Sequence, residues 1–232
     1  MKHDGRVCTL LAENQKAGIT KTVIHSVAVS WEKTEKINQF IAGTVKANPE
    51  RLVGFAAIHP SHPKLTQALE EAKTMGLEGI KIHPDFQRFA IDDPKAFLLY
   101  EWAQAKAFPL LVHVGDTRYN YSHPQKMAKV LTAFPKLKVI CAHLGGWSQW
   151  KEGYKYLTKF ENAWIDTSSS LYALSCEEAK QIIEAFDSTR ILFGTDYPMW
   201  SPKEEVKRIE KLKLPSSLLE NILVNNAKRL LE

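Results

Sequence analysis

Three apolar runs in this chain each lead to a residue type that binds divalent metal ions. Leu-Leu-Val precedes His113, Val-Ile-Cys-Ala precedes His143, and Ile-Leu-Phe-Gly-Thr precedes Asp196. Imidazole and carboxylate groups that meet at one place suit Zn²⁺ or a similar divalent ion. Such an ion lowers the pKa of a bound water towards neutrality, and a carboxylate beside it can take up the proton and pass it on. The three strand ends therefore predict a metal-dependent active site.

Each of the three residues also has an ordinary structural explanation. A lone histidine after an apolar run is usually a core residue hydrogen-bonded to backbone, and Asp196 alone could be a turn or capping residue. His143 carries more information, because Gly145 and Gly146 behind it allow a ligand to approach the backbone closely. Trp147, the next residue, could supply an apolar wall. Together, the three strand ends favour one shared site.

The elements that must position these residues are predicted from a repeating pattern of strand and helix. Strand starts recur about every 25–30 residues and each strand is followed by a helical pattern, which is the size of a βα unit. The strands are short apolar runs without alternation, as expected of parallel strands that are buried on both faces. Seven strands are expected, at residues 22–29, 52–58, 79–83, 109–114, 137–142, 163–167 and 190–193.

Seven parallel strands predict an α/β fold, a TIM-like (β/α) barrel that residues 1–232 form as a single, incomplete domain. A closed barrel has eight strands, and we expect the first to be missing. The active site of such a barrel lies at the carboxyl ends of its strands. The alternative is an open doubly wound sheet, but no Gly-rich phosphate loop follows any strand. Helix starts are predicted at Asp93-Pro94 and at three Ser-x-x-Glu capping boxes, which begin at Ser175, Ser201 and Ser217.

The composition restricts the class of protein and its partners. The net charge is +5, and the basic residues are scattered among 26 acidic ones, which is typical of a solvated surface and not of a nucleic-acid-binding stripe. Three cysteines without paired spacing argue against a disulfide framework or a zinc knuckle. No signal-peptide pattern or long apolar run is present. We therefore expect a cytoplasmic protein that binds a small-molecule substrate and neither nucleic acid nor membranes.

Five short motifs make the sequence similar to a known family. They are Gly-Ile-Lys-Ile-His-Pro from Gly79, Leu-Val-His-Val-Gly-Asp from Leu111, Cys-Ala-His-Leu-Gly-Gly from Cys141, Ile-Asp-Thr-Ser from Ile165 and Phe-Gly-Thr-Asp-Tyr-Pro from Phe193. In this order they resemble the amidohydrolase superfamily, and most closely its amidohydrolase 2 group, which also contains aminocarboxymuconate-semialdehyde decarboxylase-like enzymes. The similarity extends from about residue 9 to the C-terminal helix.

The resemblance implies a distorted (β/α)₈ barrel with one divalent metal, for which we expect Zn²⁺, with Mn²⁺ or iron as alternatives. His113 matches the metal ligand of strand five. His143 matches the strand-six histidine, which lies at the metal or acts on substrate. Asp196 matches the strand-eight aspartate, a metal ligand and proton acceptor. Lys81 and His83 match strand four, where we expect contacts with the substrate.

One departure from the family pattern is serious. The first strand of the family carries His-x-His, two metal ligands, and this chain has no such motif. We expect the chain to begin after that strand, through a mis-started reading frame, through genuine loss of the strand, or as a metal-free relative. Loss of two ligands predicts weaker metal binding. The unpaired strand edges predict association, for which a homodimer is the expected form.

The substrate contacts are predicted from the segment that follows the fifth family strand. Arg118 could clamp a substrate carboxylate, with Tyr119 and Trp147 lining the pocket. An exposed loop with an ion pair between Arg118 and Asp116 is the alternative. His25 is assigned to packing or to the surface.

Three functions remain open. The favoured one is a metal-dependent hydrolase that cleaves a C–N or C–O bond of a small carboxylated substrate with metal-activated water. The second is non-oxidative decarboxylation (a lyase reaction) of an unsaturated or aromatic carboxylate at the same metal. The third is a catalytically impaired remnant that binds a ligand or a partner.

Overall fold

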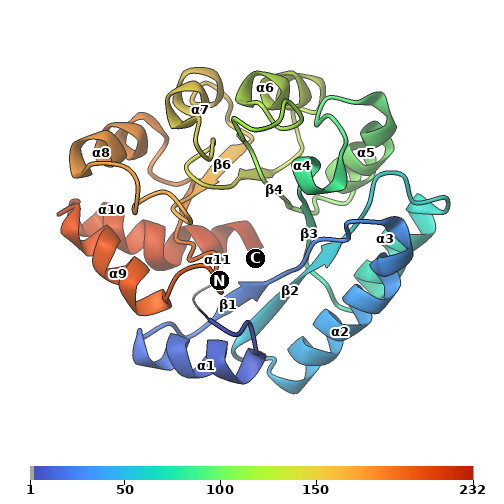
Figure 1. The fold of residues 1–232 in the computed structure, drawn as a ribbon, viewed down its shortest axis with the longest axis horizontal. Coiled ribbons are helices and arrows are strands. Elements are labelled where there is room, and N and C mark those ends of the chain that lie inside the picture. The colour runs from blue at the N-terminus through green and yellow to red at the C-terminus, as the bar shows by residue number, and fades with distance from the viewer. Residues whose placement is uncertain (1–2, 232) are drawn as a thin grey trace.

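Seven parallel strands with helices around them form an open barrel in the computed structural model, which describes residues 3–231 (Figure 1). Each strand pairs with the next one along the chain, in the order β1 to β7. The strands are β1 Thr22–Ile24, β2 Leu52–Ala57, β3 Gly79–Ile82, β4 Leu110–Val112, β5 Val139–Cys141, β6 Ala163–Asp166 and β7 Ile191–Leu192. The predicted incomplete TIM-like barrel is therefore confirmed.

Helices lie outside the strands and cover the barrel (Figure 1). They are α1 Val7–Lys16, α2 Thr34–Ala47, α3 Leu65–Thr74, α4 Pro84–Gln87, α5 Phe97–Ala105, α6 Pro124–Ala133, α7 Trp150–Leu157, α8 Cys176–Ala185, α9 Pro202–Lys211, α10 Ser216–Glu220 and α11 Asn226–Leu231. A π-helical turn, Asn221–Asn225, joins α10 to α11, and short 3₁₀ turns, Trp31–Lys33 and Pro94–Ala96, precede α2 and α5. No helix in residues 3–231 is long and apolar enough to cross a membrane.

Strands β2 to β7 are buried on both faces, whereas β1 is half-buried, and successive side chains alternate between two apolar layers. Leu111 packs inside the barrel, whereas its neighbours Leu110 and Val112 pack against the helices. The same alternation directs Lys81 and His113 inward, because each follows an inward position by two residues. The ladders thus bring ionisable side chains from several strands to the inside of the barrel.

The C-terminal helix fills one end of the barrel. Leu230 of α11 packs against the inner apolar cluster, and the C-terminus lies at the centre of the ring of strands in Figure 1. The buried members of this cluster are Val53, Phe55, Leu111, Ile140, Ala142, Trp164, Leu192 and Leu230. Polar side chains follow the carboxyl ends of the same strands, so the candidate site lies above this apolar floor.

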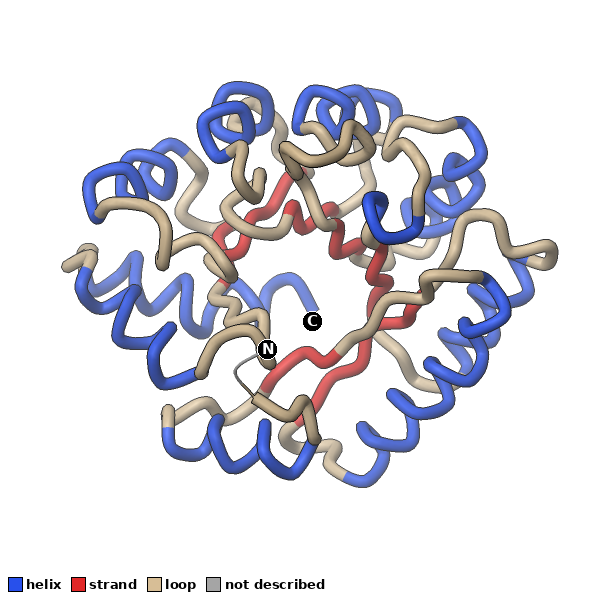
Figure 2. The backbone as a smooth tube through the Cα atoms, in the orientation of Figure 1, coloured by secondary structure: helices blue, strands red, loops and turns tan. Residues whose placement is uncertain are grey.

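The ring of strands is open between β7 and β1, which do not pair with each other in the described chain (Figure 2). Helices α1 and α9, which lie on the two sides of this opening, pack against each other. The ring of His3 stacks on Tyr197 with centroids 5.3 Å apart. The segment before α1 therefore lies against the residue that follows Asp196.

The helix caps are partly as predicted. Ser175 forms the predicted capping box with Glu178, and Asp93 accepts a hydrogen bond from the backbone N–H of Lys95. The other two capping boxes are wrong. Ser201 is at the N-cap of α9 but makes no capping bond among described residues, and the last helix begins at Ser216 after Pro215, which places Ser217 inside it. Strand β1 is also shorter than the predicted 22–29.

Gly79 is a position where the inner layer leaves no room for a side chain. It pairs with Phe55 in the β2–β3 register, and a methyl group added at Gly79 would lie 2.6 Å from the Phe55 ring. We expect Gly79→Ala to reduce the free energy of unfolding by about 1–3 kcal/mol, because overpacking forces the ring to move. Urea unfolding measures the effect.

Two variants sharpen this test. Phe55→Leu should recover part of the loss in a Gly79→Ala background, since it removes the atoms that collide. Gly43→Ala is the matched control, because no described atom lies within 4 Å of its added methyl group in α2. It should stabilise the protein by about 0.5–1 kcal/mol. Equal losses for Gly79→Ala with and without Phe55→Leu would contradict the steric explanation.

Candidate active site

His113 and His143, which follow β4 and β5, are in direct contact. His143 Nε2 lies 3.0 Å from His113 Nδ1, and both side chains are buried. On the other side of the His143 ring, Nδ1 lies 3.0 Å from the backbone oxygen of Ser168 and 2.9 Å from its hydroxyl. Both nitrogens of His143 are therefore engaged by protein groups.

These contacts determine which nitrogens carry protons. The carbonyl of Ser168 can only accept, so His143 Nδ1 carries a hydrogen and donates it. In neutral His143 the Nε2 atom then holds a lone pair and accepts from His113 Nδ1–H. Burial, reinforced by the charges of His143 and His83, holds the pKa of His113 well below its ordinary value. His113 is therefore neutral, and its Nε2 carries a lone pair that no described group binds.

Asp166, at the end of β6, anchors the same network. Its Oδ1 accepts hydrogen bonds from the backbone N–H of Ser168 at 2.9 Å and from that of His143 at 3.3 Å. The Ser168 hydroxyl also donates to Asp166 Oδ1 in a short contact. The end of β6 thus fixes both the backbone and the ring of His143.

Asp196 lies on the loop after β7 and is coupled to the same group of side chains. Its Oδ2 accepts a hydrogen bond of 2.6 Å from the Ser169 hydroxyl. Burial by itself would raise the pKa of Asp196, but His143, Ser169 and Lys81 outweigh it and hold the pKa below its ordinary value. The carboxylate is therefore ionised.

Lys81 is a buried cation inside the barrel. Burial lowers its pKa, and the charges of Asp196 and Asp166 act in the opposite direction. When it is protonated, the Lys81 ammonium group supplies positive charge inside the barrel.

His83 and Asp85 bring a further candidate cluster close to His113. His83, Asp85 and His113 each offer a possible ligand atom, and these atoms lie within 4.8 Å of one another. No other such group of three is found among described residues. The predicted set of His113, His143 and Asp196 does not form such a group. However, the rings of His83 and His113 are stacked, 3.9 Å apart and 9° from parallel. An ion cannot lie in both ring planes, as nitrogen ligation requires, unless one ring turns.

The pKa values of the Asp85 and Asp196 carboxyl groups are shifted in opposite directions. Burial raises the pKa of Asp85, whereas the pKa of Asp196 is lowered. Asp85 Oδ2 accepts from the Ser122 hydroxyl, and Oδ1 is buried without a partner among described residues. Asp196 is the carboxylate that stays charged more readily and is therefore the better cation ligand.

His25 follows β1 on the other side of the opening from Asp196. Surrounding protein, together with the charge of Lys81, lowers its pKa, while Asp196 acts in the opposite direction. Val23 lies against the inner cluster, and His25 is two residues further along the strand on the same face. Its side chain is exposed, which agrees with the assignment to packing or to the surface, although Lys81 and Asp196 are close enough to act on its pKa.

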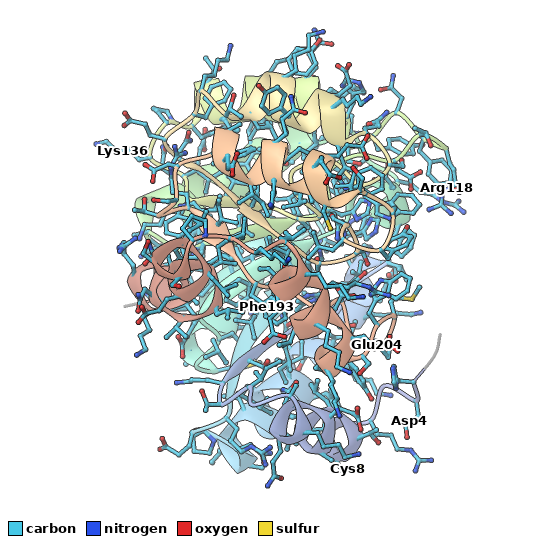
Figure 3. All side chains as sticks on the ribbon, turned by 90° about the vertical axis from the view of Figure 1, so that its left-hand side faces the viewer. Asp4, Cys8, Arg118, Lys136, Phe193 and Glu204 are labelled. Atoms are coloured by element: carbon cyan, nitrogen blue, oxygen red, sulfur yellow. The ribbon has the colours of Figure 1, made fainter. Side chains whose placement is uncertain are left out.

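Of the predicted substrate contacts, Arg118, Tyr119 and Trp147 lie at the rim, whereas Lys81 and His83 are buried. Figure 3 shows Arg118 at the edge of the carboxyl-end face, with Lys136 on the opposite side. Arg118 donates to Asp116 through Nε at 3.0 Å and Nη2 at 2.8 Å, which is the ion pair that the sequence allowed as the alternative. The guanidinium lies 5.2 Å from the Trp147 ring and 5.6 Å from the half-exposed Tyr119 ring. Arg118 is thus held in one orientation. The bonds to Asp116 use the Nε–Nη2 edge of the guanidinium and leave its Nη1–Nη2 edge unused.

Gly115 allows the backbones of two loops at this rim to approach each other closely. It has φ of +81°, and a methyl group added there would lie 2.7 Å from the backbone of Gly146 and of Trp147. The loops after β4 and β5 therefore touch backbone to backbone, which brings Trp147 over Arg118.

One observation indicates that these residues could hold a divalent cation. His113 Nε2 is buried, holds a lone pair and has no hydrogen-bond partner among residues 3–231. A neutral imidazole whose other nitrogen is fixed by a hydrogen bond is the usual form of a metal ligand. The ionised Asp196 supplies the hard oxygen that such a set needs. The roles of the predicted site residues as ligands and catalysts stay predictions.

This fold and these strand ends match a known family. A family model described as amidohydrolase matches residues 6–232. The chain therefore belongs to the amidohydrolase family, in the amidohydrolase 2 group.

One curated relative and several solved structures are similar to the chain. The 2-amino-3-carboxymuconate-6-semialdehyde decarboxylase of Dictyostelium discoideum is 25% identical over 242 residues, which are 82% of this chain and 64% of that protein. The chain thus spans less than two thirds of the length of this relative.

The structural similarity to other TIM-barrel proteins is extensive. A TIM-barrel protein from Bordetella bronchiseptica matches with a TM-score of 0.83 at 24% identity, over 97% of this chain and 82% of its own. The 5-carboxyvanillate decarboxylase of Sphingomonas paucimobilis matches with 0.77 at 19% identity, over 95% and 81%. A dihydroxybenzoic acid decarboxylase from a Polaromonas species, with bound manganese, matches with 0.75 at 18% identity, over 97% and 86%. At these identities the similarity establishes the fold.

Proposed function

We propose that this chain is the barrel of a metal-dependent, non-oxidative decarboxylase of a small aromatic or unsaturated carboxylate. The observation that carries the proposal is the His113–His143 pair, with its unpartnered Nε2 atom, beside an ionised Asp196. The relatives favour decarboxylation over the hydrolase hypothesis, because the curated relative and two of the compared structures are named as decarboxylases.

His113 and Asp196 would hold the cation, with His143 beside them. When bound, a divalent cation would neutralise negative charge on the substrate and orient it. Mn²⁺ is the first ion to test, because one compared structure contains manganese; Zn²⁺, the ion expected from the sequence, is the second.

The protein's own groups then have separate tasks. In decarboxylation the C–C bond to the carboxylate breaks, the electron pair stays on carbon, and a proton replaces the CO₂ that leaves. Asp196 is assigned to hold and move that proton, because its charge interacts with His143 and Ser169 orients its carboxylate. His143 is held by Ser168 in the tautomer that places a lone pair towards His113. Lys81 supplies positive charge inside the barrel for an anionic substrate.

Arg118 is proposed to attract the carboxylated substrate at the rim. We expect Arg118→Met to raise KM about tenfold and to change kcat little, because a rim charge acts on encounter and binding. Arg118→Lys should retain most of the effect of the charge. Steady-state kinetics at two ionic strengths measure this. Equal KM values for the wild type and Arg118→Met at low salt would contradict the assignment and leave the Asp116 ion pair as the only role.

The reaction type is tested by product analysis. The protein loaded with Mn²⁺ is incubated with aromatic and unsaturated carboxylates, and separately with lactones and amides. Release of CO₂ in a 1:1 ratio to acid consumed is expected. Hydrolysis of a lactone or amide without CO₂ release would support the hydrolase hypothesis instead. A protein that binds neither Mn²⁺ nor Zn²⁺ would support the third hypothesis, a remnant that binds a ligand or partner.

A further inference from the structure

The turn after β6 contains three consecutive serines, Ser168, Ser169 and Ser170, and all three are buried. A run of buried hydroxyl groups is unusual unless each has a partner, because an unsatisfied buried hydroxyl is unfavourable. Their partners lie on different elements of the barrel. The turn therefore joins parts of the site that are far apart in the sequence.

Ser168 and Ser170 face the His143 side of the site. The Ser168 backbone oxygen accepts from His143 Nδ1, as described above, and also from the Ser170 hydroxyl at 3.0 Å. Ser170 Oγ in turn accepts from the indole N–H of Trp150 at 3.0 Å. Helix α7 thereby holds the turn in place on this side.

Ser169 faces the Asp196 side. The indole N–H of Trp200 can only donate, and it lies 2.9 Å from Ser169 Oγ. The hydroxyl hydrogen of Ser169 is therefore directed to Asp196 Oδ2, 2.6 Å away. Trp200 itself is stacked on Tyr172 with centroids 4.4 Å apart and lies beneath the Arg208 guanidinium. The direction of this hydrogen bond is thus fixed by packed side chains.

The backbone conformation at these positions is demanding. His143, Ser169 and Asp196 all have positive φ, at 63°, 45° and 52°. Residues other than glycine rarely adopt this region, and such positions are retained where the surrounding structure determines them. The hydrogen bonds of the serine turn connect these same three residues.

We propose that Ser169 and Trp200 are positioning residues, which hold the Asp196 carboxylate in register with His143 through the turn at 168–170. The inference rests on the proposed function for the role of Asp196 at the cation. It adds to that function two residues that touch neither cation nor substrate and act through Asp196.

The test compares Ser169→Gly with Ser169→Ala. Both remove the hydroxyl, but glycine relieves the positive φ and alanine does not. We expect Mn²⁺ affinity, measured by titration calorimetry, to fall about 10–100-fold in both variants, as for other residues that orient a metal ligand. kcat should fall while KM changes little. Ser169→Gly should nevertheless be at least as stable as Ser169→Ala in urea. Trp200→Phe, which keeps the ring but removes the donor, should weaken Mn²⁺ binding by a smaller factor.

Ser217→Ala, at an exposed serine in α10, is the control and should bind Mn²⁺ like the wild type. Wild-type Mn²⁺ affinity in both Ser169 variants would overturn the inference and leave the proposed function intact. A loss of affinity that follows the loss of stability, with Ser169→Gly spared, would also overturn it. Failure of the wild type itself to bind Mn²⁺ would overturn the proposed function, and the positioning role with it.

Discussion

Asp196→Asn is expected to lower turnover by about 10²–10⁴-fold, the range that a positioned proton-transfer group contributes. The amide has nearly the same shape as the carboxylate and can still accept from Ser169, which donates to Oδ2 in the wild type. It can neither carry the proton to carbon nor supply negative charge to the cation. The measurement is the rate of CO₂ release at saturating Mn²⁺ and substrate, with circular dichroism to verify folding.

Asp92→Asn is the matched control for this substitution. Asp92 forms an ion pair of 3.1 Å with the exposed Lys129. Pairs of this kind contribute about 0–1 kcal/mol to stability, so turnover should be unchanged. Near-normal turnover in Asp196→Asn would refute the role assigned to Asp196, whatever the control does.

His113→Asn is expected to weaken Mn²⁺ binding by at least about 100-fold, since a direct ligand should matter more than the outer partners, which contribute about 10–100-fold. The asparagine amide can still donate to His143 Nε2, but it lacks an atom at the position of His113 Nε2. The substitution therefore separates the hydrogen bond between the two rings from ligation of the ion. Titration calorimetry with Mn²⁺ measures the loss.

The group of His83, Asp85 and His113 provides a second variant to compare with His113→Asn. If the ion lies between His113 and Asp196, Asp85→Asn should change Mn²⁺ affinity by only a few-fold. If the ion lies within the group of His83, Asp85 and His113, Asp85→Asn should be as damaging as His113→Asn. Retention of wild-type affinity in His113→Asn would contradict both arrangements.

The fold was largely predictable because each βα unit is a local pattern. The seven strands, their parallel order and most helices follow from short apolar runs and helical periodicity, as β2 and α2 illustrate. The failures concern ends and caps. Ser217 has the capping-box spacing, but Pro215 starts the helix two residues earlier.

The site was only partly predictable because its second half depends on tertiary contacts. His113, His143 and Asp196 were identified as strand-end residues, and the first two are in contact. Asp85 and Ser169 were missed, because each is defined by partners more than 25 residues away in the sequence. Hydroxyl residues carry no periodic signal, and only the unusual run Asp-Thr-Ser-Ser-Ser from Asp166 to Ser170 could have indicated them.

We propose that one divalent cation at His113 and Asp196 supports loss of CO₂ from a small carboxylate. The most direct measurement follows acid consumed and CO₂ released by the wild type after complete chelation, and then during stepwise addition of Mn²⁺. We expect no CO₂ without metal and a rise that saturates at one equivalent of Mn²⁺ per chain. Release of CO₂ that is unchanged by chelation, or hydrolysis of a lactone or amide with the same metal dependence and no CO₂, would contradict it.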